Sequence, residues 1–221
     1  MRNQKISLKK MNPTQNASAI YWMTAFSLET AAVLHFWPGH QFVKQEGAVR
    51  WFQLAPGIFM VEVGIGLPNP ERVAGIFQQY PPSRILQVGI SGALVDNLPV
   101  GSIIAVTESI HESGQRIPIV LPPGQWEYQG GQVTVSSPVE DRKRAVQLFE
   151  QTGAVIVDME LYHLAAILKP FGAVELMSVR VVSDQADEHA RTVIRTSLPR
   201  LKQQLRTAVS RLRTALQLHT S

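Results

Sequence analysis

Three acidic residues in this sequence directly follow segments whose apolar character predicts β-strands: Glu29, Glu160 and Asp184. In open α/β sheets the carboxyl ends of the strands meet at one edge, and ligands bind there. We therefore expect the three carboxyl groups to lie close together. Such a cluster suits a reaction in which one carboxyl group protonates a leaving group while another positions or activates water.

The elements that must position these acids alternate between strands and helices along the chain. This alternation predicts an α/β sandwich with a mostly parallel sheet. Residues 111–131 are rich in Gly, Pro and Gln and are expected to form a long mobile loop. The predicted strands are 20–25, 49–54, 57–63, 85–88, 103–107, 132–135, 155–157 and 174–182, and the predicted helices are 29–36, 70–79, 138–151 and 159–168.

The C-terminal segment carries the clearest periodic pattern. Its apolar residues recur at spacings of three and four, which places them on one helical face and predicts that this face packs on the core. Basic residues occupy the other positions and predict a solvated surface, with binding to anionic lipid or nucleic acid as alternatives. The apolar positions are Ile194, Leu198, Leu201, Leu205, Val209, Leu212 and Leu216.

The composition narrows the class of protein. The chain has 221 residues, of which 45% are hydrophobic, and it contains no cysteine. It is therefore expected to bury a substantial core and cannot use disulfide bonds, thiolate metal ligands or a cysteine nucleophile. Its six histidines show no spacing typical of a metal site, so no metal is expected.

The net charge of +4 is unevenly distributed. Residues 1–18 carry four basic residues and residues 189–221 carry seven, and neither segment contains an acid, so residues 19–188 have a net charge of −7. This acidic body argues against a nucleic-acid-binding core. The basic ends leave association with a membrane surface as an alternative.

The start of the chain is basic, but no long apolar run follows it. The segment 19–26 is too short for a signal peptide or a membrane span. The sequence therefore predicts a cytoplasmic protein with a flexible leader over residues 1–18, in which Met11 is an alternative start. A single domain is expected over residues 19–221, ending in the long amphipathic helix.

The sequence around the three acids resembles the nucleoside phosphorylase and nucleosidase superfamily, most closely its methylthioadenosine/S-adenosylhomocysteine nucleosidase branch. Four segments are similar to motifs of that family and occur in the family's order, within a resemblance that covers about residues 20 to 215. The two later segments are the more specific ones. The four segments are Thr24–Glu29, Val63–Asn69, Val157–Glu160 and Val182–Asp187.

The resemblance implies a three-layer α/β/α sandwich with a central mixed, mostly parallel sheet, and a role for each acid. Asp184 would be the general acid that protonates purine N7, with Ser183 orienting it, and Glu29 would direct the attacking water. Glu160 would hold the ribose hydroxyls, with Met159 under the sugar. The resemblance also implies a homodimer in which a partner loop helps to close the site, and no organic cofactor. Further pocket residues are expected at Gly64, Gly66, Gly89 and Ser91.

The segment Gln87–Leu94 differs from the corresponding family turn in ways that bear on the acceptor. Ile90 stands where the family has serine, and a serine follows one place later. The phosphorylase branches place an arginine just before this turn to bind phosphate, whereas this chain has glutamine and valine there. The difference favours water over phosphate. Arginines that could still approach from elsewhere are Arg50, Arg84 and Arg180.

The base and the 5′ substituent are left open by another difference. Residues Ser136–Val139 replace the phenylalanine-containing stretch that stacks on the purine in the family. A hopanoid-associated phosphorylase branch, which acts on an adenosyl lipid, shares the Ser-Pro-Val step.

These features predict a purine nucleosidase that hydrolyses the N-glycosidic bond of an adenosine-type nucleoside, with or without a 5′ substituent. The alternatives are a phosphorylase, including the hopanoid-associated type, and a non-catalytic nucleoside-binding or membrane-associated protein. Residues Gly89–Ala93 also lie one residue away from the Gly-x-Ser-x-Gly motif of serine hydrolases. That motif needs a helix directly after the serine, whereas Asp96, Asn97 and Pro99 predict a loop.

Overall fold

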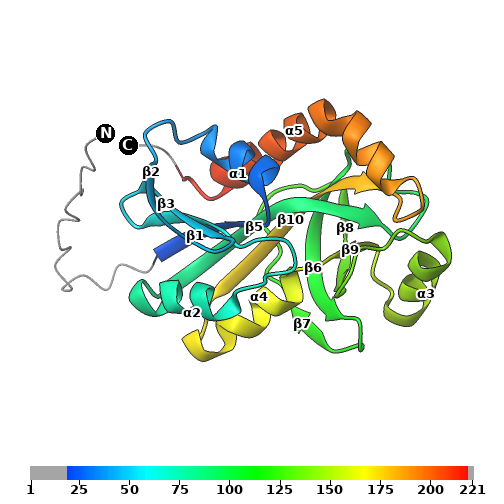
Figure 1. Ribbon diagram of the computed structural model, residues 1–221, viewed down its shortest axis with the longest axis horizontal. Coiled ribbons are helices and arrows are strands. Elements are labelled where there is room, and N and C mark those ends of the chain that lie inside the picture. The colour runs from blue at the N-terminus through cyan, green and yellow to red at the C-terminus, as the bar shows by residue number, and fades with distance from the viewer. Residues whose placement is uncertain (1–18, 219–221) are drawn as a thin grey trace.

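The computed structural model describes residues 19–218, and the predicted leader over residues 1–18 lies outside them (Figure 1). A mixed sheet lies between two helical layers, with α1 and α5 on one face and α2 and α4 on the other. The predicted three-layer α/β/α sandwich is therefore confirmed. The strands are β1 (Ala19–Thr24), β2 (Gln41–Glu46), β3 (Val49–Ala55), β4 (Ile58–Glu62), β5 (Pro82–Ala93), β6 (Ile103–His111), β7 (Arg116–Pro118), β8 (Tyr128–Thr134), β9 (Ile156–Asp158) and β10 (Glu175–Asp184). The helices are α1 (Ser27–Leu34), α2 (Pro70–Gln79), α3 (Arg142–Thr152), α4 (Leu161–Leu168), the short 3-10 helix η1 (Lys169–Phe171) and α5 (Ala190–Ala215).

The strands follow the order β10-β6-β8-β9-β5-β1-β4-β3-β2, with β7 beside β6, and β10 also pairs with β5. The two longest ladders, β5–β10 and β6–β8, are parallel. Because β1 and β10 flank β5 in parallel, their carboxyl ends meet at one edge of the sheet, and the residues that follow β1 and end β10 meet there as predicted.

Glu160 follows a strand, β9, whose direction could not be read from the sequence. The strand before it, β9, runs antiparallel to β5, with Val157 opposite Gly92. Glu160 follows the carboxyl end of its strand, as expected, but β9 is parallel to β8 and antiparallel to β5. This pairing is possible because β5 extends to Ala93.

Residues 111–131 are not one long loop. β7 lies in this segment and pairs with β6, and β8 already begins at Tyr128. The glycines that suggested a loop, Gly130 and Gly131, are strand residues. Val155 packs so closely on Gly130 that a Cβ at that position would collide with its side chain, so the glycine is required by packing and not by a turn.

Other elements also differ from the prediction. β5 spans twelve residues instead of the four expected, and the exposed edge strand β2 was not expected at all. α3 begins only at Arg142, because Asp141 caps it by accepting a hydrogen bond from the backbone N–H of Lys143 at 3.0 Å. The residues 138–140 are therefore outside the helix.

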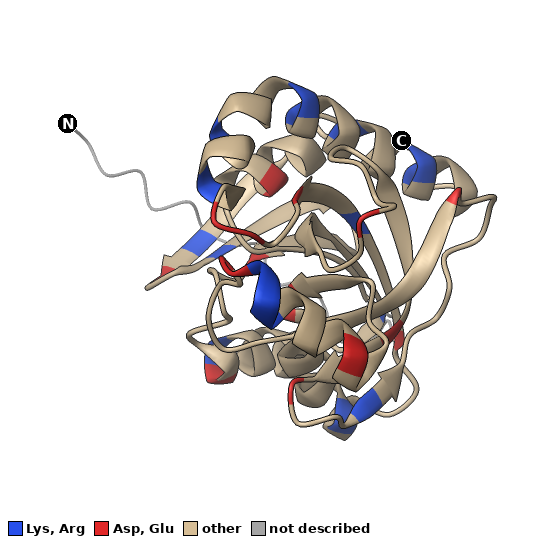
Figure 2. Ribbon diagram, turned by 90° about the vertical axis from the view of Figure 1, so that its right-hand side faces the viewer, with Lys and Arg blue, Asp and Glu red and all other residues tan. Residues whose placement is uncertain are grey.

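The C-terminal helix α5 packs on the sheet through the predicted apolar face, but the buried part of that face starts later than expected. Leu201, Leu205 and Leu212 are fully buried, whereas Leu198 is 40% exposed. The helix contains no acidic residue, and its basic residues are spread along it at the top of the molecule (Figure 2). Within residues 19–218, no helix is long and apolar enough to cross a membrane.

Replacing Leu205 by alanine should lower the free energy of unfolding by about 2–5 kcal/mol, because it removes a fully buried side chain between α5 and the sheet. Leu198→Ala is the matched control on the same helix, and its cost should stay below about 1 kcal/mol. Chemical denaturation of both variants measures the difference. Equal costs at the two positions would contradict the packing described for α5.

Candidate active site

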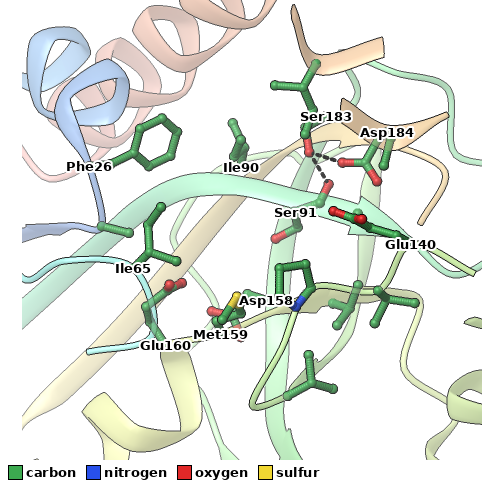
Figure 3. A pocket seen from close by; sticks show the side chains of 18 of the residues that line it. Phe26, Ile65, Ile90, Ser91, Glu140, Asp158, Met159, Glu160, Ser183 and Asp184 are labelled. Atoms are coloured by element: carbon green, nitrogen blue, oxygen red, sulfur yellow. Dashed lines mark hydrogen bonds between the residues drawn. The ribbon is translucent and has the colours of Figure 1, made fainter. Parts of the chain in front are cut away.

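A cavity of about 310 Å³ opens at the edge where β1 and β10 end and β9 leads into α4 (Figure 3). Its lining brings together Glu29, Glu160 and Asp184, which are 1%, 6% and 5% exposed. Met159, Ser183 and Ser91 also line it, whereas Gly64 and Gly66, which were expected in the pocket, do not. Three carboxyl groups buried in a largely apolar cavity are costly unless they are hydrogen-bonded or protonated, so their individual surroundings decide what each can do.

Glu29 is held by backbone amides. The N–H of Ala25 donates to Oε2 at 2.6 Å, and the N–H of Ile90 donates to Oε1 at 2.9 Å. Burial raises the pKa of Glu29 to about 7, although the nearby Arg180 and these amides lower it. A carboxyl group with this pKa is divided between its two protonation states near neutral pH and can therefore accept a proton there.

Glu160 lies across the cavity from Asp184 (Figure 3) and is fixed by a glycine turn. The N–H of Gly66 donates to its Oε1 at 2.8 Å. Gly64 and Gly66 both have positive φ, at 83° and 73°, which favours glycine at these two positions. Burial and the charge of Asp158 raise the pKa of Glu160.

Asp184 ends β10 and has two hydrogen bonds of its own. Ser183 Oγ donates to Oδ2 at 2.5 Å, and the N–H of Ala186 donates to Oδ1 at 2.8 Å. Burial nevertheless raises the pKa of Asp184, and the charges of Asp187 and Glu140 add to this effect. Such a group favours its protonated form and is suited to donate a proton.

The predicted residues around β5 have different roles. Ser91 lies within the strand and no helix follows it, so the nucleophile-elbow alternative has no structural support. Its Oγ is buried and has no hydrogen-bond partner within the described residues. Gly89 does not line the cavity but lies behind it. A Cβ there would fall 2.6 Å from Glu29 Oε1 and would also collide with the Arg180 guanidinium.

Arg180 forms a buried ion pair beneath the cavity that the sequence analysis did not assign. Its Nη2 donates to Asp158 Oδ2, and its Nε donates to Gln132 Oε1 at 3.1 Å. Asp158 also accepts hydrogen bonds from Thr134 Oγ1 at 2.6 Å and from the N–H of Leu161 at 2.9 Å. The signal in the sequence was a lone arginine inside an otherwise apolar strand.

The remaining candidate arginines are occupied elsewhere. Arg50 pairs with Glu62, and Arg84 pairs with Glu175. Within residues 19–218, Arg191 is the one basic side chain that lines the cavity, and its Nε donates to Glu140 Oε1 at 2.6 Å. Neither member of this pair was predicted. The same part of the chain holds no group of three or more His, Asp or Glu residues that could bind a metal ion.

Of the segment Ser136–Val139, only Pro138 and Val139 line the cavity, together with Glu140. They come from the stretch before α3 that was expected to be helical. Because this stretch is not helical, Glu140 can lie in the cavity next to Asp184 (Figure 3).

Comparison with known proteins identifies the fold. The sequence model of the phosphorylase superfamily matches residues 127–216. No curated protein matches the chain by sequence. Among solved structures, the futalosine hydrolase of Helicobacter pylori shares 18% identity and a TM-score of 0.77, over 91% of this chain and 98% of that chain.

Two nucleosidases give similar values. The 5′-methylthioadenosine/S-adenosylhomocysteine nucleosidase of Neisseria meningitidis, in complex with methylthio-immucillin-A, shares 19% identity and a TM-score of 0.76, over 87% of this chain and 97% of that chain. The S-adenosylhomocysteine nucleosidase of Streptococcus pyogenes, in complex with 5-methylthiotubericidin, shares 16% identity and a TM-score of 0.78, over 94% and 100%. The resemblance to the nucleoside phosphorylase and nucleosidase superfamily is confirmed.

Raising the pH should destabilise the folded protein through Glu29. Between about pH 4.5 and 7 the folded state keeps a proton on Glu29 that the unfolded chain has released. Stability therefore falls as pH rises through this window, by about 1.4 kcal/mol per pH unit for one such group. Glu29→Gln removes this contribution, so its free energy of unfolding should fall less steeply with pH.

Chemical denaturation at several pH values between 4.5 and 7 tests this expectation. Glu150→Gln, on the exposed side of α3, is the control and should follow the wild-type profile. Parallel profiles for the wild type and Glu29→Gln would show that Glu29 is not buried as described.

Proposed function

We propose that this chain, which shares the fold of these nucleosidases and the superfamily's sequence signature over residues 127–216, is a purine nucleosidase. It would hydrolyse the N-glycosidic bond of an adenosine-type nucleoside and release the free base and a ribose derivative. The observation that carries the proposal is that three buried carboxyl groups with different hydrogen-bond partners line one cavity. Asp184 lies across the cavity from Glu160 (Figure 3), and Glu29 belongs to the same lining.

The reaction needs a proton for the departing base. As the bond between C1′ and N9 breaks, its electron pair moves onto the purine, and protonation of N7 by Asp184 neutralises the charge that develops there. Ser183 and the N–H of Ala186 hold Asp184 in place. The residue acts as a general acid because burial favours its protonated form.

The sugar is the electron-poor partner in this reaction. Glu160, fixed by Gly66, would accept hydrogen bonds from the ribose hydroxyls and hold the ring in place for attack. Water then attacks C1′, and Glu29 takes the proton that the water loses. After each turnover Asp184 must regain a proton and Glu29 must release one; burial raises the pKa of both groups, for Glu29 to about 7.

The apolar rim near Glu160 suits a 5′ substituent. Phe26, Ile65 and Ile194 line the cavity, and Phe26 and Ile65 lie on the side away from Asp184 (Figure 3). An adenosine with an apolar 5′ group would place that group there. We also propose that the protein acts in the cytoplasm as a homodimer in which a second copy covers Ile65, which is 60% exposed.

Water is the proposed acceptor because no arginine is free to bind phosphate at the sugar. The buried Arg180 is bound to Asp158 and Gln132, and Arg191 is bound to Glu140. These contacts already pair both arginines with carboxylates of the described residues, which disfavours their use as phosphate ligands.

Incubation of the protein with methylthioadenosine, adenosylhomocysteine, adenosine and inosine, each with and without phosphate, tests the proposal. Free base should appear at the same rate in both conditions. Base that appears only with phosphate would identify a phosphorylase. If no nucleoside is cleaved but one still binds, the protein is a non-catalytic binding module.

Asp184→Asn should lower the turnover rate by about two orders of magnitude or more, because asparagine cannot deliver the proton to N7. The fold should persist, since asparagine has nearly the same shape. Glu188→Gln, four residues further along, exposed and outside the cavity lining, is the control and should retain most of the activity. Full turnover in Asp184→Asn would exclude this residue as the general acid.

A further inference from the structure

An ion pair that the proposed reaction does not use lies at the base end of the cavity. Glu140 comes from the irregular stretch before α3, and Arg191 comes from the first turn of α5. Both line the cavity, and the Arg191 Nε donates to Glu140 Oε1 at 2.6 Å. The side chain of Glu140 is 37% exposed, so it remains accessible from the cavity.

The Glu140 carboxylate lies beside Asp184 (Figure 3). The two side chains differ in their surroundings. Glu140 Oε1 accepts a hydrogen bond from a guanidinium group, whereas Asp184 is buried and its pKa is raised, in part by the charge of Glu140. The cavity therefore presents a proton donor, Asp184, next to a hydrogen-bond acceptor, Glu140.

Purines differ on the edge that would face this pair. Adenine offers an acceptor at N7 and a donor at its 6-amino group, whereas guanine and other 6-oxopurines offer acceptors at both positions. A donor beside an acceptor matches adenine. A carboxylate facing a 6-oxo group would place two acceptors against each other, which is unfavourable.

We infer that Glu140, oriented by Arg191, accepts a hydrogen bond from the 6-amino group of the purine and makes the site selective for 6-aminopurines over 6-oxopurines. The inference rests on the proposed function, because it takes Asp184 to face N7. Glu140 is then a specificity-determining residue, and Arg191 is the positioning residue that holds its carboxylate at the cavity.

The other groups at this end of the cavity are poorly suited to this role. The side chains of Pro138 and Val139 have no polar atoms. Asp184 is proposed to give its proton to N7 and also accepts hydrogen bonds from Ala186 and Ser183. Among the described residues, Glu140 has no hydrogen bond to its Oε2, which leaves that oxygen for the base.

The test compares kcat/KM for adenosine and inosine in the wild type, Glu140→Gln and Glu140→Ala. The wild type should favour adenosine. Both variants should lower the adenosine-to-inosine ratio by about tenfold or more, because a site built to accept from an amino group rejects a substrate without one. In Glu140→Gln part of the change should be a gain with inosine, since the amide N–H₂ can donate to the 6-oxo group.

Two further variants separate positioning from simple loss of structure. Arg191→Ala should lower the same ratio by a smaller factor, and Arg191→Lys should restore part of it, because lysine can still pair with Glu140. Glu150→Gln, exposed on α3, is the matched control and should leave the ratio unchanged. Unchanged ratios in both Glu140 variants would overturn the inference.

Binding of free adenine and hypoxanthine, measured by calorimetry, tests the inference independently of turnover. A wild-type preference for adenine that both Glu140 variants lose would support it, and equal binding of the two bases would overturn it. If the wild type cleaves nucleosides but the Glu140 variants discriminate as before, only this inference fails. If no nucleoside is cleaved, the proposed function fails and the binding result still decides the role of Glu140.

Discussion

The buried ion pair between Arg180 and Asp158 is the interaction on which the cavity depends. It joins β10 to β9. Arg180 also binds Gln132, and Asp158 also binds Thr134 and the start of α4. Losing one member of such a pair would leave an unpaired buried charge, which is costly. The positive charge of Arg180 also lowers the pKa of Glu29 and Glu160, and so offsets part of the cost of burying two carboxyl groups nearby. Gly89 allows this arrangement, because any larger residue would collide with Arg180 and Glu29.

The charges near the buried carboxyl groups differ between the two ends of the cavity. The charge of Arg180 lowers the pKa of Glu29, and Glu160 is affected both by Asp158, which raises its pKa, and by Arg180, which lowers it, whereas the charges that act on Asp184 are those of Asp187 and Glu140, both negative. The residue proposed to give up a proton is thus the one whose charged neighbours all favour the protonated form. In this account the glycosidic bond would lie between the two ends, with the base towards Asp184 and the sugar towards Glu160.

Much of this arrangement was predictable from the sequence, because the strands that carry Glu29 and Asp184 are apolar and each acid stands at the end of its strand. Short motifs also identified Glu160, Met159 and Ser183. Strand direction was not predictable: β9 is only three residues long and gives no sign that it runs antiparallel to β5. The glycines of β8 predict a loop. In the structure Gly130 is required by packing against Val155 and not by a turn. Glu140 and Arg191 were not predicted as site residues, and Arg180 was considered only as a phosphate ligand, because their partners are distant in sequence and only the fold brings them together.

The proposed reaction requires that carboxyl groups lining the same cavity differ in their protonation state. Carbon-13 NMR of protein labelled at the side-chain carboxyl groups of Asp and Glu, titrated from pH 3 to 9 and assigned with Asp184→Asn and Glu29→Gln, measures this directly. We expect the Glu29 signal to titrate near pH 7 and the Asp184 signal to titrate above the ordinary aspartate value of 3.8. If both groups titrate at the values of exposed carboxyl groups, the cavity does not hold a proton donor for the base and the proposed chemistry is wrong.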